Sequence, residues 1–257
     1  MIKSLWIGAS GMNAQMQNLD TISTNLNNMN THGYKKRTVH FADLLYQEKN
    51  KLGLPVNEAS KTEFGTGVKV NSVSKDFGQG ELIRTERELD MAIEGKGFFA
   101  LKTKDEQTVY SRVGAFDLDK EGRIINGSGL EFIPSTKIPE GTKKIEISQD
   151  GIMRAVKNDG EKEQIGEIRL HEIPNPDGLK ALGGNVFQVT KESGDAKAFQ
   201  PGEHTPAKIW QGFLESSNVN LAEEMANVLL AQRAYQISSK TVTTADQMWS
   251  IANNIRR

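Results

Sequence analysis

The 257-residue sequence contains no cysteine, which excludes disulfides, thiolate metal sites and a cysteine nucleophile and is compatible with reducing or oxidising surroundings. Its formal net charge of −1 gives no electrostatic indication of nucleic acid, a membrane surface or acidic ligands as partners. No apolar run is long enough to span a bilayer. The apolar run Leu5–Ile7 is too short for a secretory signal, so we expect any export to proceed without a cleaved leader.

Patterns that carry chemistry are also scarce. The run that starts at Asp117 begins like a calcium loop, but its twelfth position is Ser128 rather than a bidentate glutamate. A hairpin turn over residues 119–122 is the preferred interpretation. The four histidines lack the spacing of metal ligands, and the glycine-rich segments lack the order of nucleotide-binding loops. We therefore predict no catalytic residue, no cofactor-binding residue, no metal site and no enzymatic activity.

Both ends of the chain carry a heptad pattern. The N-terminal repeat places an apolar residue at every seventh position, at Leu5, Met12, Leu19 and Leu26. This is the spacing of a coiled coil, and residues 3–30 are helical in period, with Gly33 suited to the left-handed conformation that closes a helix. The glycines and asparagines of this segment cost about 5 kcal/mol relative to alanine, so we expect this helix to require packing partners.

The C-terminal segment continues the same pattern over a longer stretch. Its seven-residue step runs through Leu221, Met225, Val228, Gln232, Tyr235, Ser239, Val242, Asp246 and Trp249, with Met248 beside it. Asn220 is a candidate N-cap, with Glu223 as its capping-box partner and Glu224 adding negative charge at the positive end of the helix dipole. No glycine or proline interrupts residues 221–257, which predicts a helix of about 55 Å.

The middle of the chain has the pattern of a β-domain. From residue 76 to residue 213, glycines and prolines separate short alternating segments, and hairpin turns are expected at residues 149–151 and 158–160. Residues 41–47 suggest a short helical turn inside a polar connector. We therefore predict an α+β fold in which the terminal helices form a coiled-coil-like pair around a mostly antiparallel β-domain. The expected domains are an N-terminal helix over 1–33, a connector over 34–75, the β-domain over 76–213 and a C-terminal helix over 214–257.

Periodicity alone leaves two interpretations of the helices about equally favoured. They form a helical hairpin within a monomer, as in a binding module whose helices clamp a β-domain, or they assemble with other copies. In the second case we expect the termini to be largely disordered in the monomer and to fold on assembly. A hydrolase built from dispersed residues such as Glu94, Asp117, Asp119 and His171 is remote, because nothing in the sequence brings them together.

Both ends and much of the interior resemble one family, the flagellar basal-body rod proteins, and are most similar to its distal-rod type. The N-terminal signature matches at Leu5, Trp6, Gly11, Gln15, Asp20, Ile22, Asn25, Leu26, Asn28, Thr31, Gly33 and Tyr34. Residues 78–101 and 110–134 are similar to the core shared by rod and hook proteins, whereas residues 140–205 match only loosely. The C-terminal match includes Ser217, Asn218, Val219, Asn220, Arg233, Ala234, Tyr235, Lys240 and Asp246.

The resemblance implies a structural subunit of the bacterial flagellum, with a proximal-rod or related hook-basal-body protein as the alternative. Family members pass unfolded through the flagellar export apparatus and polymerise helically into a periplasmic drive shaft, which transmits motor torque to the hook. The terminal helices form the inner tube and the β-domain the outer layer. The implied partners are other copies, the other rod proteins, the hook protein and the P- and L-ring bushing proteins, without nucleic acid, lipid insertion or a cofactor.

The two heptad segments and the family signature together predict an assembly interface along both helices. Its expected residues are Leu5, Met12, Leu19, Ile22, Asn25, Leu26, Asn28, Met29, Gly33, Leu221, Met225, Val228, Gln232, Tyr235, Val242, Met248 and Trp249.

Overall fold

The structure is a computed structural model that describes residues 2–44, 47–48, 63–139, 141–158, 160–202 and 207–255. The chain divides into two compact units. The first consists of Met1–Asn27, Arg37–Lys75 and Asn220–Arg257, and the second of Asn28–Lys36 and Asp76–Val219. A long helix near each end and antiparallel strands between them confirm the predicted α+β class. Among the described residues, no helix has the length and apolar content needed to cross a membrane.

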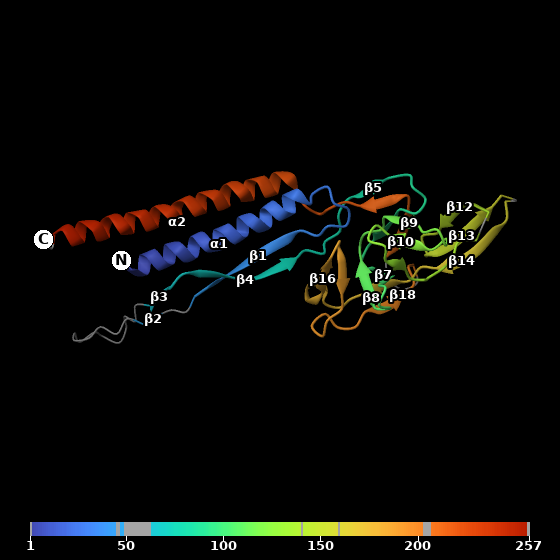
Figure 1. Cartoon of the computed structure of the whole chain (residues 1–257), viewed down its shortest axis with the longest axis horizontal. Helices are drawn as coiled ribbons and strands as arrows, with labels where there is room; N and C mark the ends of the chain where they lie inside the picture. Colours follow the sequence, from blue (N-terminus) through green and yellow to red (C-terminus); the bar gives the residue numbers. More distant parts are fainter. Residues whose placement is uncertain are drawn as a thin grey trace. The chain divides into compact units, whose positions relative to one another are not determined.

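Two long helices, α1 (Ile2–Asn27) and α2 (Leu221–Ile255), lie side by side in the first unit (Figure 1). The start of α2 confirms the predicted cap, because the Asn220 Oδ1 atom accepts hydrogen bonds from the backbone N–H groups of Ala222 at 3.0 Å and Glu223 at 3.3 Å. Gly33 has the predicted left-handed φ of +66°, but α1 has already ended at Asn27, so this glycine belongs to the turn that follows.

A β-ribbon accompanies the helices in the first unit. Strands β1 (Arg37–Asp43) and β4 (Val68–Lys75) pair antiparallel, with a register shift between His40 and Phe41, and both contact α1 (Figure 1). The short pair β2 (Gln47–Glu48) and β3 (Glu63–Phe64) belongs to the same stretch. The predicted helical turn was therefore wrong for residues 41–43, where pairing with β4 satisfies the backbone. Residues 45, 46 and 49–62 of the expected connector lie outside the described residues.

The second unit is built on antiparallel strands. In its described part, the largest sheet has seven strands in the order β16 (Lys180–Gly183), β17 (Val186–Gln188), β8 (Thr108–Ser111), β7 (Phe99–Lys102), β11 (Glu131–Phe132), β10 (Ile124–Asn126) and β9 (Phe116–Leu118). The hairpin predicted at residues 119–122 connects β9 to β10, with Gly122 N–H donating to the Asp119 carbonyl at 2.9 Å. The run that resembles a calcium loop thus contains a hairpin turn and parts of strands β9 and β10.

Smaller sheets complete this unit. A three-stranded meander contains β12 (Thr142–Ile147), β13 (Ile152–Lys157) and β14 (Lys162–Glu167). Its two turns confirm the predicted hairpins, since Gly151 and Gly160 have φ values of +83° and +81°. The remaining elements are β5 (Leu82–Arg84), paired with β20 (Phe213–Glu215), β6 (Met91–Glu94), paired with β19 (Lys208–Gln211), β15 (Leu170–Glu172), paired with β18 (Lys197–Phe199), and the 3₁₀ turn η1 (Pro176–Gly178).

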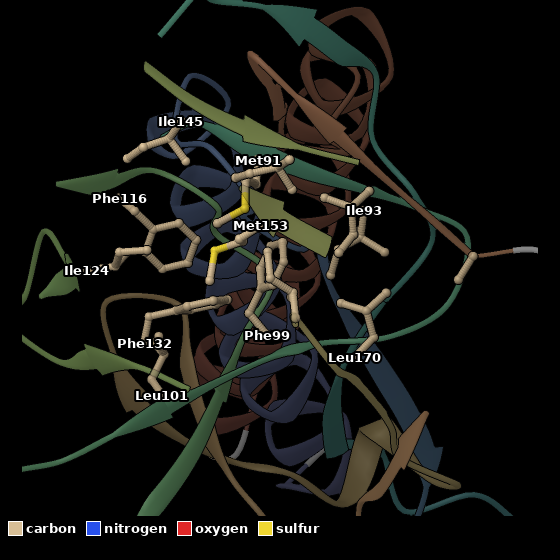
Figure 2. Close-up of a cluster of buried hydrophobic side chains, with 14 of the residues drawn as sticks. Met91, Ile93, Phe99, Leu101, Phe116, Ile124, Phe132, Ile145, Met153 and Leu170 are labelled. Atoms are coloured by element: carbon tan, nitrogen blue, oxygen red, sulfur yellow. The ribbon is translucent and has the colours of Figure 1, made fainter. Parts of the chain in front are cut away.

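Aromatic and sulfur-containing side chains fill the core of the second unit. The rings of Phe99, Phe116 and Phe132 contact one another with centroid separations of 4.8 to 5.9 Å, in tilted or edge-on arrangements (Figure 2). The side chains of Met91 and Met153 point into the same cluster (Figure 2). All five are fully buried, so this unit has its own hydrophobic core and does not depend on the helices for apolar burial.

Candidate functional site: the terminal helices

Small residues make the contact between the two helices. A Cβ atom added at Gly8 of α1 would meet Val242 Cγ2 of α2 at 2.6 Å and the Ser238 carbonyl oxygen at 3.2 Å. A Cβ atom added at Gly11 would meet Ser238 Oγ at 3.0 Å. The two helix backbones can approach this closely only because the glycines carry no side chain.

The stripe of α2 that faces α1 follows a seven-residue step through Glu224, Ala231, Ser238 and Ala245. The predicted residues Val228 and Val242 lie half-buried beside this stripe. The contact between the helices therefore differs from the heptad pattern read from the sequence, which followed the larger side chains. A spacing of alanine, serine and glutamate gives little hydrophobic signal, so the sequence pattern did not indicate this stripe.

A buried polar group joins α1, α2 and β1. The Asn25 side chain binds both backbone atoms of Arg37 at the start of β1, accepting from its N–H at 2.9 Å and donating to its carbonyl at 2.8 Å. The Asn25 amide also donates to the Glu224 carboxylate at 3.2 Å, and both side chains are buried. Polar pairs of this kind inside a helix contact fix the register of the helices.

The predicted interface residues of the N-terminal segment fall into three groups. Ile22 and Asn25 are buried within the first unit, and Leu5, Met12, Leu19 and Leu26 are half-buried on α1. Asn28, Met29 and Gly33 lie beyond the helix and belong to the second unit. Gly33 donates its backbone N–H to the Glu215 carbonyl at 2.8 Å.

Many large apolar side chains of the helices remain exposed. On α2 they include five predicted interface residues, namely Leu221, Met225, Tyr235, Met248 and Trp249. They also include residues outside the predicted heptad pattern, namely Leu229, Leu230, Ile237 and Ile251. Leu230 and Ile237 are each 68 % exposed, and Trp6 on α1 is 71 % exposed. Contiguous exposed apolar residues of this size mark interaction surfaces in soluble proteins.

The exposed residues lie on two flanks of α2. Leu221, Met225 and Leu229 follow an i, i+4 spacing and share one face, which we call flank A. Leu230, Ile237 and Met248 share another face, which we call flank B. At about 100° of rotation per residue, flank A lies about 130° from the stripe that faces α1, and flank B lies about 100° from it on the other side. A helix that is apolar on several sides is normally surrounded by other helices.

Three family models match the chain. The one described as "Flagella basal body rod protein" matches residues 5–35, "Flagellar hook protein FlgE/F/G D1 domain" matches residues 92–155, and "Flagellar basal body rod FlgEFG protein C-terminal" matches residues 211–255. These matches cover α1, part of the core of the second unit, and α2. The helix α2, which carries both flanks, therefore lies within a region that the family shares.

Relatives match over the full length. The chain is 40 % identical to "Flagellar basal-body rod protein FlgG" of Borreliella burgdorferi, with 100 % of both chains covered. It is 33 % identical to the protein of the same description in Bacillus subtilis and 29 % identical to "Flagellar hook-basal body complex protein FlhP" of that organism, again with 100 % coverage. The full-length similarity thus includes the rod protein and, more distantly, a related hook-basal-body protein. The chain belongs to the flagellar basal-body rod protein family, in its distal-rod branch, and is a structural subunit of the bacterial flagellar rod rather than an enzyme.

Proposed function

We propose that the terminal helices are the assembly elements of the rod, and that flanks A and B of α2 are covered by helices of neighbouring copies. The observation that carries this proposal is the excess of apolar surface on α2. The contact with α1 covers one side of the helix, whereas exposed leucine, isoleucine and methionine side chains remain on two further sides. Burial of a leucine or isoleucine side chain is worth about 1.5–3 kcal/mol, so repeated contacts along the helix favour a polymer.

The composition of α1 supports the same conclusion. Its glycines and asparagines make an isolated helix unfavourable, and its contact with α2 uses small side chains that bury little apolar area. We propose that both helices reach full stability only when neighbouring copies pack against them, so that subunit occupancy sets the stability of the polymer. Interlocked helices of this kind would make a rigid shaft that transmits motor torque to the hook.

The remaining expectations concern place and partners. We propose a coiled-coil-like inner tube built from the helices α1 and α2, which lie within the predicted segments 1–33 and 214–257, and an outer layer built from residues 76–213, with residues 34–75 as the connector. The location would be the periplasmic part of the rod, reached through the flagellar export apparatus without a cleaved signal. The partners would be other rod proteins, the hook protein and the P- and L-ring bushing proteins. Family membership supports these assignments.

Charge substitutions on the flanks test the assembly role. Ile237→Asp and Leu230→Asp each place a carboxylate on flank B at a side chain that the isolated chain leaves exposed. We expect the purified variants to keep the circular dichroism of the wild-type chain, because neither residue is buried within it. In cells, electron microscopy of basal bodies should find no distal rod, since a carboxylate cannot be buried against a neighbouring helix.

Ala222→Asp is the matched control, because it adds the same charge at an exposed α2 position between the flanks. Rods should form in this variant. Leu19→Asp and Tyr235→Asp change residues of the predicted assembly interface. Like the flank B variants, they should block assembly while the second unit stays folded. Normal rods with Ile237→Asp would contradict the role of flank B. In cells that lack the protein, a shaft of normal length would contradict the whole assignment.

A further inference from the structure

The chain passes between its two units four times, at residues 27/28, 36/37, 75/76 and 219/220. In the second unit, three segments flank these passages, namely residues 28–36, 76–81 and 215–219. A polar network joins all three segments to one another within that unit. The following inference rests on the proposed function, since its purpose is the transmission of force.

The Glu215 side chain is the centre of the network. One carboxylate oxygen, Oε1, accepts from Lys35 Nζ at 2.7 Å and from the Gly80 N–H at 2.9 Å. The other, Oε2, accepts from Arg112 Nε at 2.8 Å. Lys35 also donates to the Gly78 carbonyl at 2.7 Å. One side chain of β20 thereby holds the first and second segments together.

The Arg112 guanidinium extends the network into the β-domain. Its two terminal nitrogens donate to the carbonyls of Gly95 and Gly97, each at 2.6 Å. The side chains of Lys35 and Glu215 are each 1 % exposed and that of Arg112 is 5 % exposed. The three linking segments are therefore anchored to the turn between β6 and β7, next to the strand that carries Phe99.

A second centre lies at Asn218. Its Oδ1 atom accepts from the Lys36 N–H at 2.7 Å, and its Nδ2 atom donates to the carbonyls of Asp76 at 2.9 Å and Gly78 at 3.3 Å. The Asp76 N–H donates to the Lys36 carbonyl at 2.8 Å. Gly80 packs so closely on the Ser216 carbonyl that a Cβ atom would not fit. Every segment is thus bound to both of the others.

Buried ion pairs are a poor source of net stability, because desolvation of the charges offsets their attraction. Their role is specificity, since one misplaced partner leaves a buried charge without compensation. Here the charges lie far apart in sequence and meet only when the three segments are correctly placed. Other arrangements of the segments would leave these charges unpaired and are therefore disfavoured.

We propose that Glu215 and Asn218 form a clamp that makes the three linking segments one mechanical piece, so that load arriving through any passage is shared by all. A clamp predicts cooperativity. Loss of either centre should loosen amides that this centre does not bind. Independent hydrogen bonds predict only local effects.

Amide hydrogen exchange on the full-length chain measures this difference. In Asn218→Ala, exchange should rise at least tenfold at Gly33 and Gly80, whose N–H groups bind Glu215 rather than Asn218. In Glu215→Gln, exchange should rise in the same way at Lys36, whose N–H group binds Asn218. Glu106→Gln, which removes the exposed ion pair with Lys102, is the matched control and should leave all these amides unchanged.

Exchange that increases only at the amides directly bonded to the altered side chain would overturn the clamp. Glu215→Gln leaves two buried cations poorly compensated and can unfold the unit. In that case, the exchange rates of Asn218→Ala alone test the clamp. Cells carrying Asn218→Ala should build rods of normal length but lose swimming speed faster than the wild type as viscosity rises. If Asn218→Ala cells build normal rods and lose swimming speed with viscosity to the same extent as the wild type, load sharing is overturned. The flank B variants test rod assembly separately.

Discussion

Substitution of Gly8 by alanine tests whether the two terminal helices pack as closely as the structure indicates. Alanine raises helix propensity by about 0.8–1 kcal/mol in the interior of a helix. Against this gain, the new methyl group would lie 2.6 Å from Val242 Cγ2 and 3.2 Å from the Ser238 carbonyl oxygen. Overpacking of this kind typically costs about 1–3 kcal/mol. We therefore expect Gly8→Ala to lower the unfolding free energy of the first unit by about 0–2 kcal/mol.

A double-mutant cycle isolates the contact. Val242→Ala removes the methyl group that the new Cβ atom would meet, so the two substitutions together should be more stable than the sum of the single effects. Coupling between contacting residues is about 0.5–3 kcal/mol, and we expect a value of at least about 1 kcal/mol here. Urea unfolding followed by helical circular dichroism, with the unfolding free energies taken at neutral pH, measures all four proteins.

Gly11→Ala serves as the comparison. Its Cβ atom would meet the Ser238 hydroxyl at 3.0 Å, and a serine side chain can rotate away where a backbone carbonyl cannot. This variant should therefore be about 0.5–1 kcal/mol more stable than the wild type, which is most of the propensity gain. If Gly8→Ala is stabilised to the same extent and Val242→Ala has no coupling with it, the close approach of the helices is refuted.

Three further predictions address single features. Burial raises the pKa of the Glu215 carboxyl, but the charges of Arg112 and Lys35 outweigh it and the pKa lies below its ordinary value. The stability contributed by ionised Glu215 is therefore complete above its unfolded pKa of about 4.3 and is lost as the pH falls through the folded pKa. The difference in urea midpoint between wild type and Glu215→Gln should accordingly shrink as the pH falls below about 4.3. At neutral pH, loss of this carboxylate should cost about 3–5 kcal/mol in the second unit, since it leaves buried cations behind, and a cost below about 1 kcal/mol would contradict the burial. Asn220→Ala should lower the unfolding free energy by about 1 kcal/mol and speed amide hydrogen exchange in the first turn of α2. An unchanged unfolding free energy would contradict the role of the cap. Phe116→Ala should lower the unfolding free energy of the second unit by about 3–5 kcal/mol in denaturant titrations, and a near-neutral effect would argue against the aromatic cluster.

Features that depend on neighbouring residues could be predicted from the sequence. The asparagine cap of α2 binds amides two and three residues away. The hairpins at Gly122, Gly151 and Gly160 need only a residue that tolerates the left-handed region, which glycine provides without a steric penalty. The α+β class and the family could be predicted for a similar reason, since they depend on periodicity and on residues in a fixed order.

Features that depend on distant partners could not be predicted in this way. Residues 41–43 suggested a helical turn, but they form part of β1 because β4 supplies hydrogen-bond partners from a later stretch of the chain. The stripe of α2 that faces α1 was missed because alanine and serine carry little hydrophobic signal, while the more apolar side chains are exposed. The predicted assembly residues stay a prediction, since their partners would be other copies.

The sequence by itself determined the two terminal helices, the strand-rich centre, the turns and the family, because each depends on local preference or on a motif read in order. Only the tertiary structure decided that glycines of α1 meet Ser238 and Val242 of α2, and that Lys35, Arg112 and Glu215 share one buried site. The partners Lys35 and Glu215 are 180 residues apart, and Arg112 and Glu215 are 103 apart. No local preference acts over such separations, so these contacts exist only because the packed core and the paired strands bring the segments together.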